Sequence, residues 1–199
     1  MRELIVASRN KGKILEIKEL LAGLPLKVTS LLDHPHLPDV VEDGKTYKAN
    51  ALKKAITIAK ITGKMTMSDD SGIEVKALNN APGIYSARFA GEAKNEGQKN
   101  QKLFKMLKNV PMSRRQCRYR CVIALVDGKG KELGVLEGTC SGLVATKNRG
   151  TNGFGFDPLF IVVRYNKTFG ELDPSIKAKI SHRARALMKF RFLMVRHLK

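Results

Sequence analysis

Acidic residues are scarce in this chain of 199 residues: 18 Asp and Glu stand against 37 Lys and Arg, a formal net charge of +19. A basic excess attracts polyanions without regard to their sequence. The basic residues are spread along the chain, however, aromatic residues make up only 6% of it, and no recognition-helix, zinc-finger or RNP pattern occurs. Such diffuse charge predicts at most non-specific binding of nucleic acid.

Long apolar runs are also missing, because no segment approaches the ~20 apolar residues of a membrane span. The opening Met1-Arg2-Glu3 leads straight into a strand pattern, without the apolar stretch and cleavage site of a signal peptide. The cysteines Cys117, Cys121 and Cys140 are odd in number and form no metal-type pair, which fits a reducing compartment. We therefore expect a cytoplasmic chain without a membrane span, built as a single domain over residues 1–199 or as two packed lobes.

The two best-known phosphate fingerprints are absent: the sequence contains neither a Walker A spacing nor a Gly-x-Gly-x-x-Gly pattern. The chain instead opens with the apolar run Leu4–Ala7, and a helical pattern begins at Ile14. The polar turn between them consists of Ser8, Arg9, Asn10, Lys11, Gly12 and Lys13. A strand, a short turn and a helix can present amide N–H groups and an ammonium to phosphate. An ordinary strand-to-helix connection is the alternative.

Two adjacent carboxylates follow another apolar run, in the segment Ser68-Asp69-Asp70-Ser71-Gly72. At a strand end they would point into a cleft, and Gly72 could take backbone angles closed to other residues. Acids placed in this way can hold Mg²⁺ or take a proton from an attacking water. A turn with solvated Asp and Ser is the alternative, since these residues and Gly dominate turns.

Two later clusters suit a nucleotide base and its phosphates. The segment from Gly150 to Pro158 combines three glycines with Phe154 and Phe156, so that a close backbone approach and flat ring faces occur together. The segment from Lys177 to Arg183 places His182 and Arg183 in the first turn of a helix, where cations are disfavoured unless an anion meets them. The alternatives are a glycine-rich hairpin loop and a solvated basic helix start.

Periodicity predicts an α/β chain. The turn signal at Asp127–Gly130 indicates a hairpin between two long strands. We expect strands at 2–8, 26–31, 65–68, 73–76, 115–127, 132–146 and 158–163, and helices at about 11–22, 46–61 and 95–108, followed by terminal helices.

Taken together, these clusters resemble the inosine triphosphate pyrophosphatase family, whose members hydrolyse deaminated purine nucleoside triphosphates. The resemblance spans nearly the whole chain, in order and with compatible spacings. Besides the opening strand, it rests on Glu42-Asp43-Gly44, Asn50-Ala51, Ser68-Asp69-Asp70-Ser71-Gly72, Pro82-Gly83-Ile84-Tyr85-Ser86-Ala87-Arg88-Phe89-Ala90-Gly91, Gly153-Phe154-Gly155-Phe156-Asp157-Pro158, Lys167-Thr168-Phe169-Gly170-Glu171-Leu172 and Ser181-His182-Arg183.

The resemblance implies a role for each cluster. Asp70 would be the proton acceptor, Asp70 and Glu42 would be the Mg²⁺ ligands, and Ser71 would touch the substrate. The triphosphate would be held by Ser8, Asn10 and Lys13, in a turn shaped by Arg9, Lys11 and Gly12. The base would be stacked and read by Phe154, Gly155, Phe156 and Asp157, and its oxygen-bearing edge by Lys177, His182 and Arg183.

The resemblance also implies an elongated mixed sheet with flanking helices, two lobes around a central cleft, and a homodimer. The products would be the nucleoside monophosphate and pyrophosphate, from ITP, dITP or XTP. The chain departs from the family pattern at Val41 and Ala49, where family members commonly carry acids, so one acid near the metal is missing. The alternative class is a basic nucleic-acid-binding protein on a pyrophosphatase-like scaffold with weakened catalysis.

Overall fold

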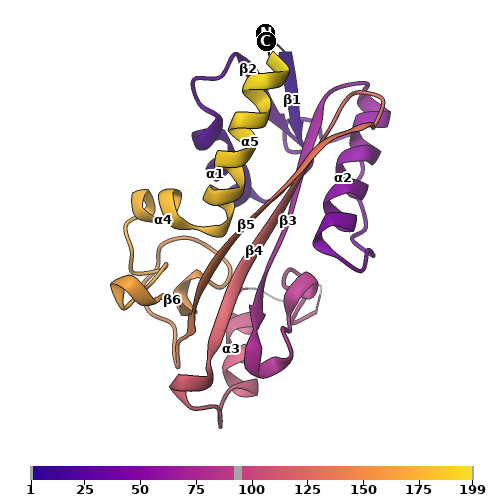
Figure 1. Cartoon of the computed structure of the whole chain (residues 1–199). Helices are drawn as coiled ribbons and strands as arrows, with labels where there is room; N and C mark the ends of the chain where they lie inside the picture. The colour runs from indigo at the N-terminus through magenta and orange to yellow at the C-terminus, as the bar shows by residue number, and fades with distance from the viewer. Residues whose placement is uncertain (1, 92–95, 199) are drawn as a thin grey trace. The chain divides into compact units, whose positions relative to one another are not determined.

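The computed structural model describes residues 2–91 and 96–198 and shows a chain of alternating strands and helices (Figure 1). Five α-helices and seven strands are present in these ranges, with short 3₁₀ turns between some of them. In chain order they are β1 (Arg2–Val6), α1 (Lys11–Leu21), β2 (Leu26–Ser30), α2 (Tyr47–Thr62), β3 (Thr66–Val75), α3 (Glu96–Met106), β4 (Gln116–Val126), β5 (Glu132–Val144), β6 (Phe160–Val162), β7 (Lys167–Thr168), α4 (Pro174–Ile180) and α5 (His182–Leu198).

The strands form one mixed sheet in the order β2-β1-β3-β4-β5-β6-β7. Strand β1 pairs in parallel with β2 and β3, whereas β6 pairs antiparallel with β5 and β7. This sheet with flanking helices confirms the α/β fold class. The arrangement of two lobes around a cleft stays a prediction from the resemblance.

The chain divides into two compact units. Unit 1 comprises residues 1–70, 121–138 and 183–199, and unit 2 comprises residues 71–120 and 139–182. The division passes through strands β3, β4 and β5 and falls next to Asp70 and Arg183. Each unit has its own hydrophobic core.

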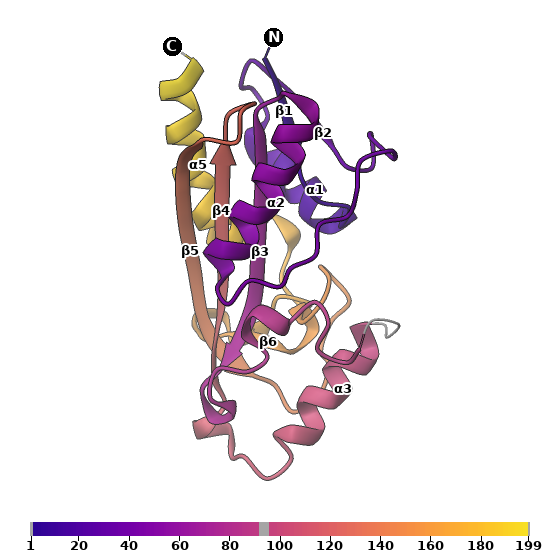
Figure 2. The ribbon, with the colours of Figure 1, turned by 90° about the vertical axis from the view of Figure 1, so that its right-hand side faces the viewer.

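Unit 1 shows how strand alternation distributes its helices. Leu4 and Val6 point to the face covered by α1 and α5, where they share a core with Phe190. Ile5 points to the opposite face and packs with Ile58 of α2. Because successive strand residues face opposite sides, the continuous apolar run of β1 is buried on both faces. Figures 1 and 2 show α1 and α5 on one side of these strands and α2 on the other.

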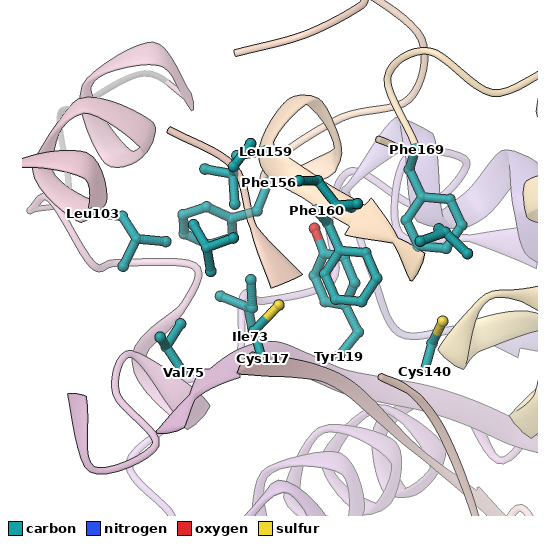
Figure 3. Close-up of a cluster of buried hydrophobic side chains, with 14 of the residues drawn as sticks. Ile73, Val75, Leu103, Cys117, Tyr119, Cys140, Phe156, Leu159, Phe160 and Phe169 are labelled. Atoms are coloured by element: carbon teal, nitrogen blue, oxygen red, sulfur yellow. The ribbon is translucent and has the colours of Figure 1, made fainter. Parts of the chain in front are cut away.

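Unit 2 is built around aromatic rings (Figure 3). The ring of Tyr119 in β4 stacks on Phe160 of β6, with centroids 4.5 Å apart, and Phe160 stacks on Phe169 at 5.2 Å. Offset or parallel ring pairs of this kind add stability beyond the apolar area that they bury. This ladder anchors the short strands β6 and β7 to the longer β4.

The structure corrects the sequence predictions at several elements. Strand β3 runs without a break through Thr66–Val75, whereas two short strands separated by an Asp-rich turn were expected. Strand β7 was not predicted, and β6 is shorter than the expected 158–163. The expected start of α3, at residue 95, lies outside the described residues. Across the described parts of the chain, no helix is long and apolar enough to cross a membrane.

Candidate active site

Residues 8–13 form the amino-terminal end of α1 directly after β1. The Asn10 side chain caps the helix by accepting a hydrogen bond from the Lys13 N–H at 3.0 Å, and Ser8 Oγ accepts one from the Asn10 N–H at 3.2 Å. No acidic side chain occupies the first turn, so the positive end of this helix is open to an anion from elsewhere. Lys11, which is exposed, and Gly12 lie in that first turn.

Arg9 does not extend toward an anion but braces the neighbouring loop. Its guanidinium pairs with Asp39 at 2.8 Å and donates to the carbonyls of Leu31 and Leu37, both at 2.7 Å. These contacts agree with a shaping role for Arg9. They give it no contact that would identify it as a phosphate ligand.

Asp69 pairs with two cations of unit 1. Its carboxylate Oδ2 lies 3.2 Å from Lys13 Nζ and 3.1 Å from a terminal nitrogen of Arg183. Burial alone would raise the pKa of Asp69, but the charges of Lys13 and Arg183, together with Lys54, outweigh it and hold that pKa well below its usual range. Asp69 is therefore ionised, and it fixes the ammonium of Lys13 at the end of α1.

Arg183 is placed differently from its predicted role as a base reader. Its guanidinium is buried between Asp69 and Glu16, with the Glu16 contact at 2.5 Å. These two carboxylates supply anions at this helix start, where cations are otherwise disfavoured. The base-reading role of Arg183 stays a prediction, and none of these contacts supports it.

Asp70 faces the opposite side of β3, toward α2. Its Oδ2 accepts a hydrogen bond from Asn50 at 2.9 Å. On the same face Lys54 forms an ion pair with Glu42 and donates to the Asp69 carbonyl at 2.6 Å. Burial raises the pKa of Asp70; the Lys54 ammonium opposes this rise, and the like charge of Glu42 adds to it. A carboxylate with a raised pKa is better suited to accept a proton near neutral pH.

The strand geometry explains why neighbouring acids have different partners. Met67 packs on the α1 and α5 side and Ser68 donates to the Ala51 carbonyl of α2, so the faces alternate residue by residue along β3. Asp69 continues the first face and Asp70 the second. The sequence interpretation, in which both acids point from a strand end, is therefore wrong.

Glu42 and Asp70 are the candidate ligands for a divalent cation. Within the described part of the chain, no group of three His, Cys, Asp or Glu residues is arranged to hold a metal ion. Mg²⁺, however, is usually held by one or two carboxylates together with water and substrate phosphates. Burial is the main cause that raises the pKa of Asp70; the Lys54 ammonium opposes this rise, and Glu42 lies near enough for its like charge to add to it. These two acids fit such an ion in type and number.

The loop from Gly150 to Asp157 in unit 2 is held by an internal network. Asp157 Oδ2 accepts hydrogen bonds from the Phe154 N–H at 2.9 Å and from Lys177 Nζ at 2.6 Å. Gly153 has a φ of +76°, and a Cβ atom there would lie 2.1 Å from the same Asp157 oxygen. Glycine is therefore required at this position both by its backbone angle and by the close approach of a carboxylate.

The two phenylalanines of the loop differ in exposure. Phe156 is buried in the core of unit 2 (Figure 3), and its ring contacts that of Phe89. Phe154 is only partly buried and lies under the Lys177 ammonium at 4.6 Å. The expectation that both rings contact the base is therefore narrowed. Phe156 anchors the loop, and stacking of Phe154 on the base stays a prediction.

His182 and Lys177 remain candidates for base recognition. The His182 ring stacks on Tyr119 with centroids 4.3 Å apart, and the Tyr119 hydroxyl lies 3.4 Å from Asp157 Oδ1. Lys177, His182 and Asp157 are all buried; His182 and Asp157 both contact Tyr119, and Lys177 pairs with Asp157. Ser71, which is half-buried, follows Asp70 in β3 and begins unit 2.

Gly72 is required for a reason that the sequence did not reveal. Its φ is not in the left-handed region. A Cβ atom there would instead lie 2.2 Å from the Gly83 carbonyl oxygen and 2.5 Å from Ser86 Oγ. Gly72 therefore allows a close approach of two chain segments, and it does not serve a special backbone angle.

Sequence reasoning also missed Lys54 as a member of the acid cluster. Lys54 lies one turn after Asn50, on the face of α2 that carries Ala51, Ala55 and Ile58. A lysine on an apolar helix face is costly unless an anion meets it. That pattern was the available signal, and Glu42 is the anion that meets it.

Comparisons with known proteins agree with one another. The model of the Ham1 family matches residues 4–193. The dITP/XTP pyrophosphatase of Desulforamulus reducens is 46% identical over 94% of this chain and 92% of that protein, and the one of Geobacter sulfurreducens is 47% identical over 94% of each. Among solved structures, a HAM1 protein from Coxiella burnetii aligns with a TM-score of 0.90 and 37% identity, covering 98% of this chain and 100% of that one. The Staphylococcus aureus Ham1 protein aligns with a TM-score of 0.87 and 37% identity, covering 100% of both chains.

Proposed function

The chain belongs to the Ham1 family, and from this membership we propose that it hydrolyses deaminated purine nucleoside triphosphates to the monophosphate and pyrophosphate. The substrates would be ITP, dITP and XTP. Relatives that match this chain over almost their whole length are dITP/XTP pyrophosphatases. The class is that of a hydrolase acting on a phosphoanhydride. Nothing in the comparisons supports the alternative of a nucleic-acid-binding protein.

The observation that supports this reaction is that the pKa values of the two neighbouring acids, Asp69 and Asp70, shift in opposite directions. Asp69 is held ionised by the cations around it, while Asp70 keeps a raised pKa. Pairs of titratable groups whose environments push their pKa values apart mark acid–base assignments. Asp70 is accordingly the proton acceptor, and Asp69 positions Lys13.

Asp70 takes a proton from the water that attacks the α-phosphorus. A new bond forms between the water oxygen and that phosphorus, the bond to the bridging oxygen breaks, and pyrophosphate leaves. Lys13 and the N–H groups at the start of α1 hold phosphate oxygens, as a helix amino terminus with an ammonium does in other nucleotide sites. Lys54 is kept charged: burial would lower the pKa of its ammonium, but Glu42, Asp69 and Asp70 raise it.

Glu42 and Asp70 would hold Mg²⁺, which when bound neutralises negative charge on the phosphates. The chain lacks the family's common acids at Val41 and Ala49, so these two carboxylates carry the metal with the help of the substrate. A requirement for a divalent cation is what a nucleotide pyrophosphatase generally shows. The choice of Mg²⁺ is part of the proposal.

Base selectivity would come from donors that face a carbonyl. Hypoxanthine and xanthine carry an oxygen at C6, where adenine carries an amine, so buried donors favour the deaminated bases. Lys177 and His182 supply such donors in unit 2, and Phe154 offers a ring face for stacking.

The decisive experiment measures pyrophosphate release from a panel of ITP, dITP, XTP, ATP and GTP with Mg²⁺. The expected result is pyrophosphate and monophosphate, formed fastest from the deaminated nucleotides. Release of orthophosphate would contradict the cleavage position, and no release from any triphosphate would contradict the enzyme class. We further propose that the protein is cytoplasmic and forms a homodimer. Light scattering would test the homodimer, which should have twice the mass of one chain.

A further inference from the structure

We infer that Asn100 in α3 is a positioning residue for base recognition, acting through the loop that carries Phe154. The inference rests on the proposed function and deepens it, because it concerns how unit 2 selects the base. The Asn100 side chain is buried, with 3% of its surface exposed. Neither the sequence motifs nor the proposed roles of Lys177 and His182 include it.

The Asn100 amide holds the loop at one defined carbonyl. Its Nδ2 donates to the Gly155 carbonyl oxygen at 3.2 Å and to Asn148 Oδ1 at 3.3 Å. A carbonyl can only accept, so the amide nitrogen must face Gly155. Asn100 therefore contacts the loop both at its beginning, near Asn148, and at Gly155, between the two phenylalanines.

The opposite side of the same short segment is held by Asp157. The Phe154 N–H donates to Asp157, and the next residue's carbonyl accepts from Asn100. Gly155 has a φ of +66°, a conformation with few local restraints in glycine. The Asn100 contact holds the Gly155–Phe156 peptide, so losing it would free the backbone directly after Phe154 to rotate about Gly155 and would loosen the segment that carries the Phe154 ring.

An unpaired atom shows that stability alone does not explain Asn100. Its Oδ1 is buried and has no hydrogen-bond partner among the described residues. Leaving a buried acceptor unpaired costs at least as much as one hydrogen bond returns. Leu103, one turn further along α3, packs in the core beside Phe156 (Figure 3), so an apolar residue of similar size would suit this helix face. A buried polar residue that carries such a cost while it holds the Gly155 carbonyl points to a role in positioning the loop.

Asn100→Leu replaces the amide by an apolar side chain of similar size and should separate stability from base binding. The melting temperature should stay within about 3 °C of the wild type or rise, because the unpaired oxygen is removed together with two long hydrogen bonds, and the Gly155 carbonyl, at a partly exposed residue, can bond to water in their place. The affinity for IMP, measured by calorimetry, should fall at least ~10-fold, the effect of a lost hydrogen bond in a closed site. Binding of tripolyphosphate, which has no base, should not change.

Two further variants make the test decisive. Asn100→Asp keeps the size but loses both donated hydrogen bonds, so it should also weaken IMP binding if Asn100→Leu fails to fold. Asn109→Leu makes the same change at an exposed position just after α3 and should leave IMP affinity unchanged. In turnover, Asn100→Leu should raise the KM for ITP more than it lowers kcat and should shrink the ITP-to-ATP ratio of kcat/KM.

The failure of this inference is distinguishable from failure of the proposed function. A wild-type protein that binds IMP but releases no pyrophosphate would contradict the proposed reaction, and the binding comparison would still test Asn100. Unchanged IMP affinity in Asn100→Leu and Asn100→Asp would overturn the positioning role. Equal weakening of IMP and tripolyphosphate binding, with a large fall in melting temperature, would overturn it as well, because Asn100 would then be only structural.

Discussion

Asp69 and Asp70 are chemically identical neighbours, and their environments make them different. Strand alternation turns Asp69 toward Lys13 and Arg183 and turns Asp70 toward Asn50 and Lys54. Asp69 faces two cations and remains ionised, so its role is to hold them in place. Asp70 keeps a pKa raised by burial, with Glu42 adding to the rise against Lys54. The two pKa values therefore shift in opposite directions within two residues of one strand, as the proposed roles of positioning for Asp69 and proton transfer for Asp70 require.

Asp70→Asn should reduce turnover of ITP by at least ~100-fold, because it removes the group that accepts the proton and contributes to metal binding. The amide preserves the size of the side chain, so the circular dichroism spectrum and melting temperature should remain close to those of the wild type. Steady-state kinetics at saturating Mg²⁺ measure the effect. Near-normal turnover there would mean that another group, with Glu42 as the first to be examined, is the base.

Asp69→Asn should instead destabilise the fold. It leaves Lys13 and Arg183 without their shared buried anion, a change worth about 3–5 kcal/mol or roughly 6–20 °C in melting temperature. The folded-state pKa of Asp69 is depressed, so its contribution is present above the unfolded value of about 3.9 and is lost as the pH falls below it. Thermal melts of both proteins should therefore converge toward acid pH. A constant difference from pH 7 to pH 3 would contradict the linkage.

His182→Ala and Arg183→Ala are neighbouring changes that should have different effects. His182 lies with Lys177 and Asp157 in unit 2, so its loss should shrink the ITP-to-ATP ratio of kcat/KM by roughly 5- to 150-fold. Arg183 is engaged by Asp69 and Glu16, so its loss should lower the rates on both substrates together. Kinetics on both nucleotides decide the question, and a ratio that falls only in Arg183→Ala would restore the role of base reader that the sequence predicted for Arg183.

Helix α2 shows that an element's buried face can supply a site as well as a core. Asn50 and Lys54 occupy the same buried face as Ala51, Ala55 and Ile58. Asn50 donates to the Asp70 carboxylate of β3, and Lys54 donates to the Asp69 carbonyl. The Thr46 cap and the left-handed Gly63 fix the two ends of the helix. The helix thus delivers one amide and one ammonium to Asp70 and Glu42 from a rigid support.

Lys54→Met should keep the packing of the side-chain stem and remove the ammonium. Glu42 would lose its ion-pair partner, and both acids would face each other without the fixed cation. We expect turnover of ITP to fall roughly 10- to 100-fold, which is the size of rate loss expected when one electrostatic contact near a reacting centre is removed. Lys53→Met, one residue earlier and paired with the exposed Asp43, is the matched control and should retain activity. Equal activity in both variants would exclude Lys54 from the site.

The elements that the sequence predicted well are those with a local signal. Helices α1 and α2 follow from their apolar periodicity and begin within one residue of the expected positions. Strand β3 was divided into two because Asp, Ser and Gly favour turns when they are considered locally. The partners that keep Asp69 and Asp70 inside a strand come from α1, α2 and α5, which are far away in the sequence. No local pattern could reveal them, and the same holds for the contact of Asn100 with Gly155.

The net charge of +19 is carried mainly by side chains outside the proposed site. Lys13, Lys54 and Lys177 are largely buried, and each meets a carboxylate. Lys102, Lys105 and Lys108, on and after α3, are examples of the exposed lysines that contribute surface charge. The charge relevant to catalysis is therefore enclosed and balanced, while the excess belongs to the solvated surface.

This distinction predicts opposite responses to salt. Each surface contact with a nucleic-acid phosphate releases counterions, so oligonucleotide binding should weaken steeply as salt rises. Exposed charges further than about 8 Å from the bound triphosphate are screened at physiological salt, whereas enclosed ion pairs are screened much less. Hydrolysis of ITP should therefore persist from low salt to physiological salt while binding of a single-stranded oligonucleotide, followed by fluorescence anisotropy, fades without sequence preference. If tight, sequence-dependent oligonucleotide binding survived at that salt and no triphosphate released pyrophosphate, the basic surface would be the functional one and the hydrolase assignment would be wrong.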